Sequence, residues 1–207
     1  MNYKTEQEAF WAGEFGDDYL ERNQGKQIIA SNIALFTKVL AHINSPKSII
    51  EFGSNVGLNL EALSILLPEV ELSAIEINAK AVETLKRFNN LKVYHSSILD
   101  FTPKSTHELA IIKGVLIHIN PFELQNVYEK LYVSSDRYIC ISEYYNPTPV
   151  ETNYRGHDGR LFKRDFAGEM LDKYPDLKLV DYGFVYHRDL NFPQDDMTWF
   201  LLEKCAQ

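Results

Sequence analysis

Apolar side chains recur along this chain at two alternating spacings, and the alternation predicts an α/β fold. Short apolar runs bounded by glycine, proline or polar residues are typical of buried strands, whereas apolar residues repeated every three or four positions are typical of helices. On this basis we predict strands over residues 48–52, 70–77, 91–95, 108–113, 137–143, 177–187 and 197–205, and helices over residues 6–20, 26–43, 58–67, 79–88, 121–132 and 164–173.

The order of these elements indicates how the sheet is built. Most of the strands are separated by a helix, which is the pattern of βαβ units and gives a parallel sheet with helices on both faces. The last two strands are joined only by the turn-rich residues 189–196. We therefore expect a mostly parallel seven-stranded sheet with an antiparallel strand at its C-terminal edge. A length of 207 residues fits a single domain, 1–207.

Two segments stand outside this alternation. Near the N-terminus, within residues 1–25, Phe10, Trp11, Phe15 and Tyr19 follow a roughly helical spacing, so we expect an amphipathic helix that is broken at its glycines, Gly13 and Gly16. Residues 145–163 are polar, rich in turn-forming residues and without periodicity. We expect them to form a long loop, and loops of this kind are often functional.

Composition and charge remove several classes of function. The chain has 21 basic and 29 acidic residues, a net charge of −8, which disfavours nucleic-acid binding because that depends on attraction to phosphate. No apolar run approaches the roughly 18 residues of a membrane span. The polar N-terminus does not resemble a signal peptide, so we expect a cytoplasmic protein whose two cysteines, Cys140 and Cys205, are reduced. Metal-ligand spacings such as CxxC and HExxH do not occur, so we expect no metal site.

The end of the first predicted strand carries the clearest chemical signal. Glu51 is followed by a tight turn that contains Gly53, Ser54, Asn55 and Gly57, and a helix begins there. Glycine and asparagine tolerate the left-handed backbone of such a turn, which lets a ligand approach the main chain. About 20 residues further on, Glu76 ends the second strand, where a carboxylate can accept hydrogen bonds from the ribose of a nucleoside cofactor.

Two sequence templates compete for this turn. The dinucleotide template G-x-G-x-x-G needs glycine at positions 55 and 58, where this chain has Asn55 and Leu58. The template E-x-G-x-G-x-G matches at Glu51, Gly53 and Gly57, with Asn55 at its middle glycine. In this respect the chain resembles the class I S-adenosylmethionine (SAM) dependent methyltransferases. A nicotinamide-dependent oxidoreductase and a non-catalytic SAM-binding module remain alternatives.

The resemblance implies SAM as cofactor, S-adenosylhomocysteine (SAH) as product, a Rossmann-like fold, and a lid formed by residues 1–25. The alternative for the aromatic residues of this segment is that they only pack on the core. In this family the loop after the third strand borders the adenine, and the end of the fourth strand faces the methionine moiety. The implied cofactor-binding residues are Phe15, Tyr19, Arg22, Glu51, Gly53, Ser54, Asn55, Gly57, Glu76, Ile77, Ser97, Ile98, Lys113 and Gly114.

A narrower resemblance concerns the methyl acceptor. Residues 10–19, 113–121, 144–147 and 154–166 together resemble the methyltransferases associated with pseudaminic acid biosynthesis. This implies a small sugar or nucleotide-sugar acceptor in the biosynthesis of surface polysaccharides or nonulosonic acids. The oligomeric state is not indicated.

Methyl transfer needs an aligned nucleophile and, for a hydroxyl acceptor, a general base; a neutral amine needs none. His118 follows the fourth strand and is the candidate base, although a packed histidine is the alternative. Tyr144 and His157 are the other catalytic candidates. Arg155 and Arg160 could pair with an acidic group of the substrate, or belong to a solvated turn, and Tyr145 could line the acceptor site.

Overall fold

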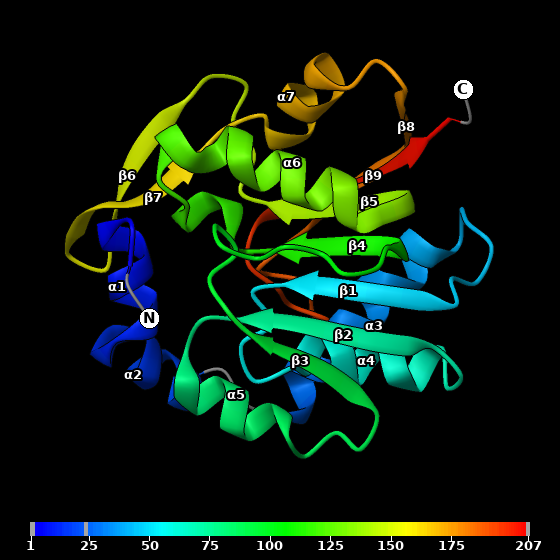
Figure 1. Cartoon of the computed structure of the whole chain (residues 1–207), viewed down its shortest axis with the longest axis horizontal. Coiled ribbons are helices and arrows are strands. Elements are labelled where there is room, and N and C mark those ends of the chain that lie inside the picture. The colour runs from blue at the N-terminus through cyan, green and yellow to red at the C-terminus, as the bar shows by residue number, and fades with distance from the viewer. Residues whose placement is uncertain (1–2, 23–24, 206–207) are drawn as a thin grey trace.

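The central sheet has the predicted arrangement. In the computed structural model, which describes residues 3–22 and 25–205, seven strands form one sheet in the order β3-β2-β1-β4-β5-β9-β8 (Figure 1). These strands are β1 (Ser48–Phe52), β2 (Glu71–Glu76), β3 (Leu91–His95), β4 (His107–Lys113), β5 (Ser135–Glu143), β8 (Leu177–Val185) and β9 (Met197–Lys204).

Strand directions confirm the mostly parallel sheet. The pairs β1–β2, β1–β4, β2–β3 and β4–β5 are parallel, whereas β9 is antiparallel to both β5 and β8. No helix lies between β8 and β9, so the chain turns back directly and β9 fills the place between β5 and β8. The predicted antiparallel pairing at the C-terminal edge is therefore confirmed.

Helices cover both faces of the sheet. One face packs against α3 (Lys26–Leu40), α4 (Leu58–Leu66) and α5 (Ala79–Leu85), and the other against α6 (Leu124–Ser134) and α7 (Phe166–Lys173) (Figure 1). Successive side chains of a strand point to opposite faces of the sheet. Ile49 therefore packs in the core on the side of α3, α4 and α5, and Ile50 packs in the core on the side of α6 and α7. Two short 3₁₀ turns, Leu116–His118 and Pro121–Glu123, precede α6, which therefore begins three residues later than predicted.

The N-terminal segment forms two helices, α1 (Glu6–Ala12) and α2 (Glu14–Arg22), at the carboxyl ends of the strands (Figure 1). The predicted break occurs at Gly13 but the predicted break at Gly16 was wrong. Gly16 lies inside α2, where a Cβ atom would come within 1.9 Å of the carbonyl oxygen of Trp11. Its small size permits close packing of the two helices.

The prediction of a long irregular loop over residues 145–163 was also wrong. Strands β6 (Val150–Tyr154) and β7 (His157–Lys163) form an antiparallel hairpin. Its two-residue turn has positive φ at Arg155 (53°) and Gly156 (89°), as a type I′ turn requires. Arginine is unusual at the first of these positions, and most side chains of β6 are exposed and polar, so neither a turn motif nor apolar alternation marks the hairpin.

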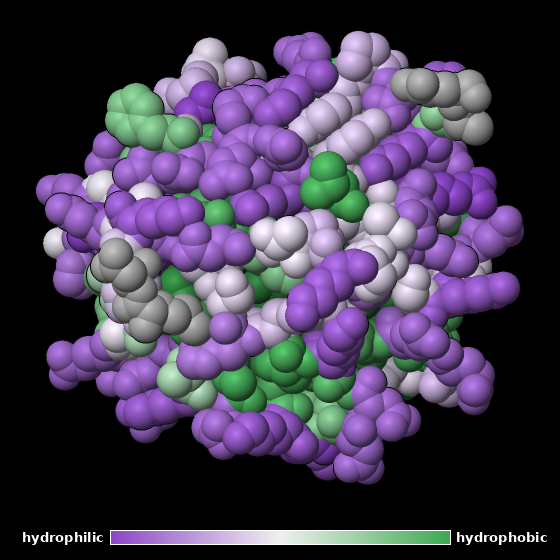
Figure 2. Space-filling model, viewed as in Figure 1, coloured by the Kyte–Doolittle hydropathy of each residue, from purple (hydrophilic) through white to green (hydrophobic). Residues whose placement is uncertain are grey.

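Figure 2 shows a face that is mostly hydrophilic, with apolar side chains gathered in small areas. Among the helices that the structure describes, none has the length and apolar character needed to cross a membrane.

The hairpin turn generates a stability prediction. Asparagine tolerates the left-handed backbone better than arginine, so Arg155→Asn should raise the free energy of unfolding by about 0.5–1 kcal/mol. Arg155→Val is the matched variant, and its β-branched side chain should lower the same free energy by about 1 kcal/mol. Urea unfolding measures both. Equal stabilities of the two variants would show that residue 155 is not in a left-handed turn.

Candidate functional site

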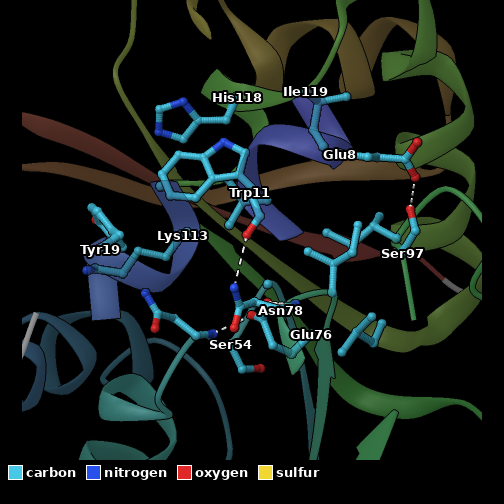
Figure 3. A pocket seen from close by; sticks show the side chains of 18 of the residues that line it. Glu8, Trp11, Tyr19, Ser54, Glu76, Asn78, Ser97, Lys113, His118 and Ile119 are labelled. Carbon is cyan, nitrogen blue, oxygen red and sulfur yellow. Dashed lines mark hydrogen bonds between the residues drawn. The ribbon is translucent and has the colours of Figure 1, made fainter. Parts of the chain in front are cut away.

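A cavity lies at the carboxyl ends of the parallel strands, beneath α1 and α2 (Figure 3). Its wall brings together segments that are far apart in the sequence: the lid, the glycine turn, and the loops after β2, β3 and β4. The predicted site residues that line it are Tyr19, Gly53, Ser54, Asn55, Glu76, Ile77, Ser97, Ile98, Lys113, Gly114 and His118.

The turn after β1 has the predicted backbone. Gly53, Asn55 and Gly57 have φ values of 77°, 48° and 82°, all in the left-handed region. A Cβ atom on Gly53 would lie 2.7 Å from Cγ2 of Val115, so glycine is also required there for packing against the loop after β4. Asparagine therefore replaces the middle glycine of the template without changing the turn.

Glu76 is buried at the end of β2 and is held from two sides. Its Oε2 accepts a hydrogen bond from the backbone N–H of Asn55 (2.6 Å), and its Oε1 accepts one from the backbone N–H of Asn78 (2.7 Å). Burial raises the pKa of Glu76, and the two hydrogen bonds oppose that rise. Each carboxylate oxygen can accept a second hydrogen bond, so the group can still bind a pair of ligand hydroxyls.

In and beside the glycine turn, several buried polar atoms have no hydrogen-bond partner within the protein. Among the described residues, Oδ1 of Asn32, Asn55 and Asn59 accepts no hydrogen bond, and all three residues line the cavity. Beside them, Oε1 of Glu51 accepts a hydrogen bond from Nδ2 of Asn59 (2.6 Å), and its Oε2 is also without a partner. Burial raises the pKa of Glu51 to about 7. Unsatisfied buried acceptors of this kind suit a ligand that brings several N–H donors.

Lys113, at the end of β4, adds a positive charge at the same place. Among the described residues that line the cavity it is the one with a cationic side chain. Burial lowers the pKa of this lysine, and the charge of Glu51 opposes that fall. Acceptors beside an ammonium fit both groups of a free amino acid: an α-ammonium on the asparagine oxygens that line the cavity, and an α-carboxylate on Lys113.

Two residues without a predicted role, Glu8 and Asn78, attach α1 and α2 to the loops after β2 and β3. Glu8 Oε1 accepts a hydrogen bond from the Ser97 hydroxyl, and Asn78 Nδ2 donates to the Trp11 carbonyl (3.3 Å) and to Asp17 Oδ1 (2.8 Å). Sequence signals for two of these residues existed. Thr5 and Glu8 have the spacing of a capping box, and Asn78 precedes a predicted helix as an N-cap does.

His118 is buried against the lid in a fixed orientation. Its Nδ1–H donates to the carbonyl oxygen of Arg160 (2.6 Å), and its ring lies 4.6 Å from that of Trp11 and 4.8 Å from that of Tyr154. Burial lowers the pKa of His118 to about 4. The imidazole is therefore neutral near pH 7, with its lone pair on Nε2.

Two predicted cofactor residues on the lid do not line the cavity. Phe15 stacks on Phe10, with ring centroids 4.1 Å apart, and the guanidinium of Arg22 lies over the rings of Phe15 (5.3 Å) and Tyr19 (5.9 Å). Glu51 and Gly57 also lie behind the cavity wall rather than in it.

None of the predicted acceptor-side residues lines the cavity, and their roles stay predictions. His157 contacts the ring of Phe10 (5.1 Å), and Arg160 lies over the same ring and within 3.2 Å of Glu6. Arg155 is at the hairpin tip. Tyr144 and Tyr145 follow β5. Burial and the nearby Asp195 raise the pKa of Tyr144, and the ring of Tyr145 contacts that of Phe200.

Within the described residues, no group of three or more His, Cys, Asp or Glu could hold a metal ion.

Comparison with known proteins identifies the fold. No family model and no curated protein matches this sequence. Solved structures do match. One is the Burkholderia thailandensis 1,6-didemethyltoxoflavin-N1-methyltransferase, solved with bound 1,6-didemethyltoxoflavin and SAH. Its TM-score is 0.75 at 12% sequence identity, and the match covers 100% of this chain and 92% of that one. The chain has the fold of the class I SAM-dependent methyltransferases.

Two further structures share this fold. The magnesium protoporphyrin IX methyltransferase from Synechocystis, with bound SAM, has a TM-score of 0.71 at 12% identity and covers 99% of this chain and 100% of its own. The N-methyltransferase NodS from Bradyrhizobium japonicum, with SAH, has a TM-score of 0.67 at 13% identity, over 91% of this chain and 98% of that one.

The buried His118 generates a prediction about pH. Because its folded-state pKa of about 4 lies below the ordinary 6.5, the unfolded chain binds a proton that the folded chain does not. The stability contributed by a neutral His118 is present above pH 6.5 and is lost as the pH falls toward 4. Between pH 7.5 and 5 the unaltered protein should lose roughly 2 kcal/mol more unfolding free energy than His118→Asn.

Urea unfolding at both pH values measures this difference. The asparagine side chain can still donate to the Arg160 carbonyl. Contributions from other buried groups, such as the raised pKa of Glu143, are common to both proteins and cancel in the comparison. An equal pH dependence of the two proteins would contradict a buried neutral imidazole.

Proposed function

We propose that this chain is a SAM-dependent methyltransferase that acts on a small polar acceptor. The observation that carries the proposal is the polarity of the cavity: one part offers acceptors and an ammonium for an amino acid, and the adjoining part offers the buried carboxylate of Glu76. SAM joins an amino acid to a nucleoside. A dinucleotide such as NAD has no α-ammonium to satisfy the oxygens of Asn32, Asn55 and Asn59.

Each part of the cofactor has residues that suit it. Glu76 would accept hydrogen bonds from the ribose hydroxyls, Lys113 would bind the α-carboxylate, and Ile77 and Ile98 would pack against the base. The bound cofactor supplies an activated methyl group on a sulfonium. The chain's own contribution is to position the acceptor and to exclude water, and the docked lid serves both.

His118 is the side chain that we assign to proton transfer. A hydroxyl acceptor must lose a proton, and Nε2 of a neutral imidazole can accept it. The carbonyl of Arg160 fixes the tautomer, and the rings of Trp11 and Tyr154 fix the ring plane. For an amine acceptor the same nitrogen would only orient the nucleophile.

For the acceptor we propose a sugar or nucleotide-sugar of surface polysaccharide or nonulosonic acid biosynthesis, methylated in the cytoplasm. The support is the narrower sequence resemblance, together with free cysteines, Cys140 and Cys205. The aromatic rings around His118 also suit a ring substrate with apolar faces and polar edges. The similar structures include a 1,6-didemethyltoxoflavin-N1-methyltransferase and a magnesium protoporphyrin IX methyltransferase, so the shared fold leaves the acceptor to experiment.

Calorimetric titration tests the cofactor assignment. SAH should bind saturably with one site per chain, and NADH in a parallel titration should not. Glu76→Ala should weaken SAH binding by about 30-fold or more, because hydrogen bonds to a buried charged group contribute about 1.5–3 kcal/mol.

The matched control for this titration is Glu83→Ala. Glu83 lies in α5, and its exposed carboxylate pairs with Lys86 just after that helix, so SAH affinity should not change. Binding of NADH alone would overturn the proposed function, and an unchanged SAH affinity of Glu76→Ala would remove the ribose assignment.

A further inference from the structure

A second buried carboxylate, that of Glu8 in α1, lies in the same cavity as Glu76 but comes from the lid. Glu8 is 7% exposed and lines the cavity with Ser97 and Ile98. Figure 3 shows Glu8 and Ser97 on the side of the cavity opposite to Lys113 and Tyr19. If the amino acid group is held at Lys113 and the ribose at Glu76, as the proposed function states, the base is left facing Glu8.

The hydrogen bonds within this end of the cavity determine which donors and acceptors remain for the base of a ligand. The hydroxyl of Ser97 donates its one proton to Glu8 and accepts from the backbone N–H of Leu99 (3.0 Å). Ser97 therefore has no proton left for a ligand, which changes the role that the sequence suggested for it. Its part in the folded chain is to hold the glutamate.

Glu8 itself keeps an acceptor position. Its Oε2 accepts from the backbone N–H groups of Lys4 (2.6 Å) and Thr5 (2.9 Å), and its Oε1 accepts from Ser97. A carboxylate offers about four lone-pair sites, so one on Oε1 remains. Three hydrogen-bond donors therefore fix the Glu8 carboxylate, and its remaining position can bind only a ligand atom that donates a hydrogen bond.

From these contacts we propose that Glu8 recognises the adenine base of the cofactor by accepting a hydrogen bond from its 6-amino group. The inference rests on the proposed function. A 6-amino group brings N–H donors, whereas a 6-oxo base presents an oxygen that a carboxylate repels. Because Glu8 belongs to α1, recognition of the base and docking of the lid occur through the same side chain.

The test compares two ligands that differ at this one position, SAH and its 6-oxo analogue S-inosylhomocysteine, by calorimetric titration. The unaltered protein should bind the 6-oxo analogue at least about 100-fold more weakly, because a buried carboxylate would face a carbonyl oxygen. In Glu8→Gln the side-chain amide can donate to that oxygen, so the ratio of the two affinities should fall below about 10-fold.

Two variants serve as controls, and a thermal melt establishes that each is folded. Glu6→Gln changes a neighbouring carboxylate on the same helix that is 83% exposed and pairs with Arg160, so the ratio should stay as in the unaltered protein. Ser97→Ala removes the hydroxyl but keeps the carboxylate, which the backbone N–H groups of Lys4 and Thr5 still hold, so the unaltered protein's preference for SAH should persist.

Several results would overturn the inference. Equal affinities of the unaltered protein for the two ligands would do so without any variant. So would a preference for SAH that disappears in Ser97→Ala and survives in Glu8→Gln, because the hydroxyl would then read the base. If the unaltered protein binds neither ligand, the proposed function itself falls; tight SAH binding without discrimination removes only the role of Glu8.

Discussion

The two backbone hydrogen bonds that Glu76 accepts hold the floor of the site together. One comes from Asn55 in the glycine turn and the other from Asn78 at the start of α5, so a single buried side chain fixes the loops after β1 and β2. A buried carboxylate without such partners would be costly. The left-handed backbone at Gly53 and Asn55 is what allows the turn to present an N–H group to it.

The same interaction extends to the lid. Asn78 donates its backbone N–H to Glu76, and its side chain caps α5 and reaches the Trp11 carbonyl and Asp17. The position of Trp11 against His118 therefore follows from the floor of the cavity. With Glu8 on Ser97 as the second attachment, α1 and α2 are held over a site whose polar groups are already oriented, which lowers the cost of ordering them when a ligand binds.

How far the sequence predicts this structure depends on the range of the interactions. The buried strands, the turn through Gly53 and Asn55, and the helical character of the N-terminal segment follow from local patterns, and all are present. The hairpin at Arg155 was missed because its strands are polar and its turn residue is atypical. The attachment of Glu8 to Ser97 was missed because a contact between residues 89 positions apart leaves no periodic trace.

We propose that one cavity binds SAM along its length, with Glu76 at its middle. A crystal structure of the chain grown with SAH tests this most directly. We expect SAH beneath α1 and α2, with its ribose hydroxyls on Glu76 and its α-carboxylate on Lys113. A ligand bound outside this cavity, or one whose ribose makes no contact with Glu76, would contradict it.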